Sequence, residues 1–183
     1  MKTVIVISLL ALLSCGCNET SVSPGPNLLA HSAKDRLAEV NSLAESLGKG
    51  LRLLVVSSQD IRIDGTSDSW QYRYVDTSNL SYWFHASSSA VAFDSTSSTG
   101  VGAAFITHPW FNSDSALFVA ELNGGAQFRQ QNSNYLIVGS IGEPVIPNAT
   151  TTWWIGYRSK DDKSKSLYLA IDAMTGTVTS KYP

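Results

Sequence analysis

The amino-acid sequence predicts an α+β fold, a single compact body made of two tandem repeats of one helix followed by a short antiparallel sheet. Apolar residues recur every three or four positions in two segments, which is the period of an amphipathic helix. In the segments that follow each of these, apolar and polar residues alternate, which is the period of a half-buried strand. The 183-residue chain is 43% hydrophobic and 15% charged, so it can bury a core.

The first predicted unit covers residues 28–95. Its helix spans residues 28–47, where Leu37, Val40 and Leu47 lie on one face and Gly48 ends the helix. Short runs of β-forming residues follow, and clusters of turn-forming residues separate them. These runs are the expected strands, at 51–57, 59–64, 70–75, 82–86 and 90–94.

The second predicted unit covers residues 114–183, and residues 96–113 join it to the first. Asp114 is expected to cap its helix. Four apolar residues of this helix are expected to face the core: Leu117, Phe118, Leu122 and Phe128. Strands are expected at 135–139 and 152–158, and as a hairpin within 167–180.

The two predicted units also align with each other in sequence. Leu54-Val55-Val56 aligns with Leu136-Ile137-Val138, and Trp70 aligns with Trp153. The offset between the units changes only at turns, where insertions are tolerated. The alignment predicts an internal duplication. The alternative is that antiparallel α+β units share this order of elements in any case.

Residues 1–14 are predicted to be a signal peptide. Lys2 precedes an apolar run at 4–13 that is too short to cross roughly 30 Å of hydrocarbon. Leu12-Leu13-Ser14-Cys15 resembles the bacterial lipobox, and the resemblance implies that Cys15 becomes the lipidated N-terminus of an exported lipoprotein. Two or three acyl chains would anchor it stably in a membrane of the bacterial cell envelope. The alternative is an ordinary signal peptide that is cut near Ser14.

Residues 15–27 are predicted to form a flexible tether between the lipid and the folded body, because they are polar and contain Pro24-Gly25-Pro26. Cys15 and Cys17 are the only cysteines of the chain. The body is therefore expected to contain no disulfide and no cysteine-based catalytic or zinc site.

The sequence carries no signature of catalysis, of a metal site or of a cofactor site. It lacks a nucleophile elbow, an HExxH helix and a phosphate-binding glycine loop, and its three histidines are isolated in sequence. The run at 64–69 resembles the start of a calcium loop, but Ser69 and Val75 stand where such a loop needs Gly and Glu. A net charge of -2 also gives no basic surface for nucleic acid. The protein is therefore expected not to be an enzyme.

Five tryptophans and seven tyrosines are the unusual feature of the composition, and alternation along strands assigns them to two faces. Two sets are expected to lie under the helices: Trp70, Tyr72 and Tyr74, and Trp153, Ile155 and Tyr157. The opposite face would carry the candidate partner-binding residues: Arg73, Trp83, His85, Trp154, Arg158 and Tyr168, with Gln71 beside them. Large rings next to arginine are typical of a protein-binding hot spot. The alternative is that two sheets pack on each other and bury these rings.

The C-terminal residues resemble the closing hairpin of PepSY and PepSY-like domains, in which an Asp, a turn Gly and a β-branched residue end a helix-plus-sheet module. Asp172, Gly176 and Val178 match that hairpin. The resemblance covers residues 114–181 and, more weakly, 30–95, where the Asp and the Gly are missing. It implies a secreted or lipid-anchored bacterial protein that binds or inhibits a peptidase. The doubled layout is also similar in architecture to secreted β-lactamase inhibitor proteins, whose concave sheet grips an enzyme loop.

These observations predict a non-catalytic lipoprotein of the bacterial envelope that binds a protein or peptide on an open aromatic sheet face. An exported peptidase is the partner class that the resemblance implies. The alternative is a structural or envelope-assembly lipoprotein without a discrete ligand site, in which the rings only hold the fold together.

Overall fold

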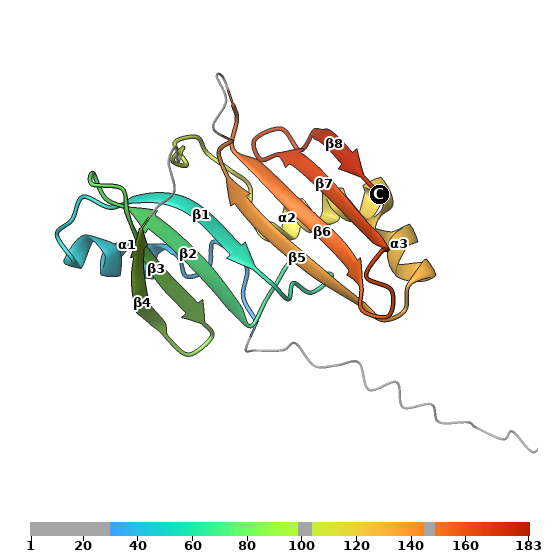
Figure 1. Cartoon of the computed structure of the whole chain (residues 1–183), viewed down its shortest axis with the longest axis horizontal. Helices are drawn as coiled ribbons and strands as arrows, with labels where there is room; N and C mark the ends of the chain where they lie inside the picture. Colours follow the sequence, from blue (N-terminus) through green and yellow to red (C-terminus); the bar gives the residue numbers. More distant parts are fainter. Residues whose placement is uncertain (1–29, 99–103, 145–148) are drawn as a thin grey trace, which may run out of the picture.

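The computed structural model describes residues 30–98, 104–144 and 149–183, so the predicted signal peptide, Cys15 and the tether lie outside the described residues. Two helical segments each precede four strands (Figure 1). The first group is α1 (Leu37–Ser46), β1 (Arg52–Ser58), β2 (Ser69–Val75), β3 (Leu80–Ser87) and β4 (Val91–Ser98). The second group is α2 (Ser113–Ala120), η1 (Glu121–Gly125), α3 (Ala126–Gln131), β5 (Tyr135–Gly142), β6 (Thr152–Ser159), β7 (Ser166–Asp172) and β8 (Val178–Tyr182). Within the described ranges, no helix is long and apolar enough to span a membrane.

All eight strands form one antiparallel sheet in the order β4-β3-β2-β1-β5-β6-β7-β8. The prediction of two tandem repeats, each with its own short sheet, is therefore wrong. The two predicted sheets are joined at the centre, where β1 pairs with β5 from Val55↔Gly142 to Ser58↔Gly139. Two separate sheets would leave the β1 and β5 edges unpaired, and their pairing satisfies those backbone groups.

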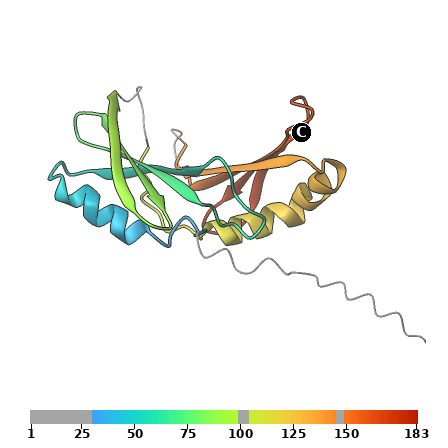
Figure 2. The same cartoon turned by 90° about the horizontal axis from the view of Figure 1, so that it is seen from below.

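The helices cover only one face of this sheet. Figure 2 shows α1 and the α2–α3 segment together on one side, while the outer strands at both ends extend from the level of the helices toward the other side. The uncovered side is therefore concave. We call it the open face. The alternative in which two sheets bury each other's rings does not apply, because the described residues contain a single sheet.

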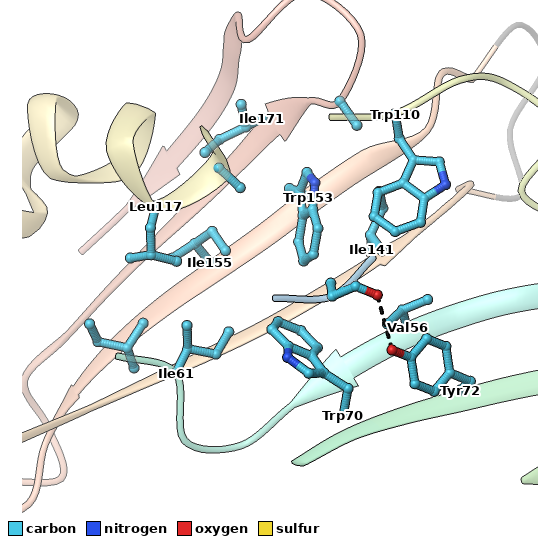
Figure 3. Packing of buried hydrophobic residues seen from close by; sticks show 14 of the residues in the cluster. Val56, Ile61, Trp70, Tyr72, Trp110, Leu117, Ile141, Trp153, Ile155 and Ile171 are labelled. Carbon is cyan, nitrogen blue, oxygen red and sulfur yellow. Dashed lines mark hydrogen bonds between the residues drawn. The ribbon is translucent and has the colours of Figure 1, made fainter. Parts of the chain in front are cut away.

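The core lies between the helices and the sheet, and tryptophans join its two halves (Figure 3). Trp70 of β2 and Trp153 of β6 are both fully buried, with ring centroids 6.3 Å apart in an edge-to-face arrangement. Trp110 packs against Trp153 in the same way at 5.9 Å. The two fully buried indoles each donate a hydrogen bond to a backbone carbonyl, Trp70 Nε1 to His31 at 2.8 Å and Trp153 Nε1 to Phe111 at 3.0 Å. These bonds satisfy the only polar atom of each ring.

Several local expectations are wrong. Residues 59–64 form a loop rather than a strand, because their backbone pairs within the turn and Ile61 N donates to Ile137 O beside β5. The first helix begins at Leu37, since the preceding residues bridge to Ser67 through His31. The second helix is capped by Asn112, whose side chain accepts from Ser113 N, and not by Asp114.

The second helix also turns two predicted core residues outward. Phe118 is 66% exposed and Leu122 is 71% exposed, whereas Leu117 and Phe128 are buried. The two exposed residues are one helical turn apart, on a solvent-exposed side of the helical segment. The helical segment kinks within η1, where Asn123 and Gly124 leave helical backbone angles and Gly124 adopts φ 121°.

Candidate functional site

The open face carries the seven side chains that sequence alternation assigned to it. On β2 and β3 they pair across the strands as Arg73↔Trp83 and Gln71↔His85. Their neighbours Trp70, Tyr72 and Tyr74 point into the core and are buried. Because alternate residues of a strand point to opposite faces, the burial of one set exposes the other to the concave side.

The β2–β3 part of the open face is held by polar contacts. The Trp83 indole donates to Ser97 Oγ at 2.9 Å, and the Arg73 guanidinium lies 5.1 Å from the centroid of the Trp83 ring. His85 Nδ1 contacts the carboxylate of Asp94 on β4, and both side chains are about one-third exposed. These contacts fix the orientation of the Trp83 and His85 side chains before any ligand arrives.

The β6–β7 part of the open face is an aromatic platform laid over a strand. A Cβ on Gly156 would come within 2.6 Å of the Tyr168 ring, so this ring lies directly on the glycine backbone. Arg158 Nε donates to the Tyr168 hydroxyl at 2.5 Å. Trp154 is 39% exposed, and its ring reaches across to Gly142 of β5. Glycine at 156 therefore makes room for the Tyr168 ring to lie on the sheet, whereas a Cβ at Gly142 would meet the Trp154 ring at an ordinary contact distance of 3.8 Å.

A row of directly paired residues connects the two parts across the centre of the sheet. The row runs from β3 to β6 through His85, Gln71, Ser57, Ser140 and Trp154. The side chains at the two ends of the row are bulky, and those at its centre are serines. The small serines make a shallow floor in the middle of the open face, in addition to the curvature of the sheet seen in Figure 2. The structure thus places the predicted residues of β2 and β3 on the same face as those of β6 and β7, with Ser57 and Ser140 between the two sets.

Three adjoining hollows follow this floor. A central hollow of about 200 Å³ is lined by Ser140, Trp154, Arg158 and Tyr168. It shares Gln59 with a hollow of about 230 Å³ that contains Asp60 and Asp68. It shares Arg158 and Tyr168 with a third hollow of about 500 Å³ at the β6–β7 hairpin. Together they form an open groove, and we call it the sheet groove.

Sequence reasoning missed Gln59, Lys160 and Lys163, which line the sheet groove. Gln59 falls in the segment that was expected to be a strand, and the loop conformation brings it to the open face. Lys160 and Lys163 belong to the β6–β7 hairpin, whose charged composition was the available signal. Turn residues are usually assigned to solvent, so their place beside Tyr168 was not apparent from alternation.

Two histidine–carboxylate contacts are the nearest arrangements to an acid–base pair: His85 with Asp94 on the open face, and His108 with Glu143, which lies just after β5 and serves the fold. Glu143 is only about 10% exposed on its side chain and accepts hydrogen bonds from Thr107, His108 and Thr151. Burial acts to raise the pKa of Glu143, but these hydrogen bonds outweigh it and lower the pKa to about 2. A carboxylate that stays ionised and fully bonded at neutral pH is a poor proton acceptor. Among the described residues, no group of three or more potential metal ligands is found.

A fourth hollow, of about 470 Å³, lies on the helix side of the sheet. Phe118 and Met174 line it, and both are more than half exposed. This surface, here called the helix-side patch, is a rival interaction site because exposed apolar clusters mark contact surfaces in some proteins.

No family model, curated protein or solved structure matches the chain. The PepSY-like resemblance of residues 114–181 stays a hypothesis, and function has to be argued from the geometry of the open face.

Proposed function

We propose that this protein is a non-catalytic binding protein of the bacterial envelope, which docks a protein or peptide partner in the sheet groove. The observation that carries the proposal is the exposed Trp154 ring on the concave face, beside the Arg158–Tyr168 pair. Burying a large ring and an arginine in a pre-oriented concave surface is the usual basis of a binding hot spot. An exported peptidase is the partner class that we favour, on the strength of the PepSY-like hairpin.

Partner capture tests this proposal. The full chain, solubilised in detergent, is the bait for envelope and secreted fractions of the host, beside the Trp83→Ala, Trp154→Ala double variant. We expect a partner to bind the parent chain and to be lost from the double variant, because truncating a hot-spot ring weakens binding by about 2 kcal/mol or more. The Phe118→Ala variant is the matched control, since it removes an exposed ring from the helix-side patch.

The capture experiment distinguishes a binding role of the rings from a purely structural one. Circular dichroism and thermal melting establish that each bait is folded. If the folded double variant captures the same proteins as the parent chain, the open face is not the docking surface. If the double variant melts well below the parent chain and Phe118→Ala does not, the rings serve the fold, as the structural or envelope-assembly alternative requires.

We also propose that the protein is exported and held at a membrane through lipid on Cys15. The lipobox-like residues Leu12-Leu13-Ser14-Cys15 support this proposal. The Cys15→Ala variant is then expected to lose incorporation of radiolabelled palmitate, because a thioether to the lipid requires the cysteine sulfur. Equal labelling of the parent chain and the Cys15→Ala variant would contradict the anchor, and Cys17→Ala is the control that should keep the label.

A further inference from the structure

The largest hollow of the sheet groove is cationic. Three positively charged side chains, Arg158, Lys160 and Lys163, surround a volume of about 500 Å³ together with the apolar walls Leu136 and Tyr168. Arg158 and Tyr168 stand on the open face of β6 and β7, and the two lysines come from the hairpin between these strands. The hollow is therefore an extension of the groove toward the hairpin.

No carboxylate is found among the residues that line this hollow. The ion pairs within residues 30–98, 104–144 and 149–183 include none of its three cations. The hairpin also contains Asp161 and Asp162, but neither lines the hollow. Asp161 accepts from Asn134 Nδ2 at 2.6 Å, and Asp162 accepts from Ser164 and lies 3.7 Å from Lys165. Like charges that converge on a concave surface focus an attractive potential for anions.

The charge changes sign along the groove. The hollow at its other end contains the carboxylates of Asp60 and Asp68, although Arg62 pairs with Asp68 at 2.8 Å. Between the two ends lie Trp154 and Ser140. An extended ligand therefore meets cations at the hairpin end, rings in the centre and carboxylates beyond them.

We infer that the partner presents a short acidic peptide segment to the sheet groove. One or more Asp or Glu side chains occupy the hollow of Arg158, Lys160 and Lys163, and an adjacent apolar or aromatic side chain lies against Trp154 and Tyr168. The inference rests on the proposed function and adds the chemistry of the segment that is recognised. Guanidinium and ammonium groups are the natural partners of carboxylates, and a neighbouring ring supplies apolar contact area.

Selection from a phage-displayed random peptide library tests the inference, with the full chain immobilised in detergent as the target. We expect enriched peptides to carry at least two acidic residues next to an aromatic or large apolar residue. A representative enriched peptide, labelled with fluorescein, then reports affinity by fluorescence anisotropy. Reversing two cations in the Lys160→Glu, Lys163→Glu variant should weaken its binding at least tenfold.

Lys49→Glu supplies the control for charge reversal away from the groove. Lys49 is exposed in the turn after α1 and lines none of the three hollows, so its reversal changes net charge without changing the site. We expect this variant to bind the acidic peptide within about twofold of the parent chain, where local rather than overall charge decides affinity. Equal losses in Lys49→Glu and in the hairpin variant would overturn the inference.

The outcomes separate this inference from the proposed function. Two results would overturn the inference of an acidic segment but leave the binding site in place. In the first, enriched peptides need Trp154 but are not rich in acidic residues. In the second, they bind the Lys160→Glu, Lys163→Glu variant as well as the parent chain. Peptides that bind the Trp154→Ala variant as well as the parent chain overturn the binding site itself. Binding of heparin, with no enrichment of acidic peptides, would assign the cationic hollow to a sulfated polysaccharide and also overturn the inference.

Discussion

Replacing Trp153 with alanine is expected to lower the free energy of unfolding by about 3 to 5 kcal/mol. The Trp153 side chain is fully buried, and its ring packs edge-to-face against both Trp70 and Trp110. Its indole nitrogen also donates to Phe111 O at 3.0 Å, so truncation leaves a cavity and an unpaired carbonyl acceptor. Because Trp70 and Trp153 come from β2 and β6, the loss affects both halves of the sheet.

The neighbouring tryptophan provides the comparison. Trp154 follows Trp153 in the same strand but points to the open face and is 39% exposed. Trp154→Ala should therefore lower the free energy of unfolding by about 1 kcal/mol. Urea denaturation followed by far-ultraviolet circular dichroism measures both variants. Similar losses for the two substitutions would mean that the Trp154 ring belongs to a core, against the arrangement described above.

Replacing Gly65 with alanine is expected to cost about 3 kcal/mol of folding stability. Gly65 adopts φ 82° in the loop between β1 and β2, a conformation that costs an L-residue about 1 to 2 kcal/mol. A Cβ at this position would also lie 2.3 Å from Asp114 Cα and 2.5 Å from Asp114 N, at the start of α2. Backbone atoms of a helix cannot turn aside as a flexible side chain can, so the loop and the helix have to separate.

Gly48→Ala is the matched control for Gly65→Ala. Gly48 has φ 63°, but a Cβ there meets no atom within 4 Å. Its replacement carries the conformational cost alone, which we expect to be about 1 kcal/mol. The same urea titration compares the two variants. If Gly65→Ala is no less stable than Gly48→Ala, the contact between the β1–β2 loop and α2 does not contribute to the fold.

The faces of the strands were predictable from sequence because side-chain period is a local property. Trp70, Tyr72 and Tyr74 alternate with polar residues, and this alternation fixes which side faces the core. The same alternation assigns Trp153 to the core and Trp154 to the opposite face, although both are tryptophans in adjacent positions. The strand residues of the open face could therefore be predicted from the sequence.

The pairing of strands was not predictable, because it depends on contacts between segments far apart in sequence. Nothing in the alternation of β1 indicates that Val55 lies opposite Gly142, yet this pairing turns two expected sheets into one. The outward orientation of Phe118 and Leu122 was missed for a related reason, since apolar residues were taken to be buried. The sequence also did not indicate that Lys160 and Lys163 line the same hollow as Tyr168, because this depends on how the β6–β7 hairpin folds.

Photo-crosslinking tests most directly whether the open face is the docking surface. Benzoylphenylalanine is placed at Ser140, in the floor of the sheet groove, or at Phe118, in the helix-side patch. The full chain is expressed in its host and irradiated in intact cells. We expect a covalent adduct with a partner protein from Ser140 and none from Phe118. An adduct from Phe118, with none from Ser140, would contradict this expectation and move the interaction to the helix side.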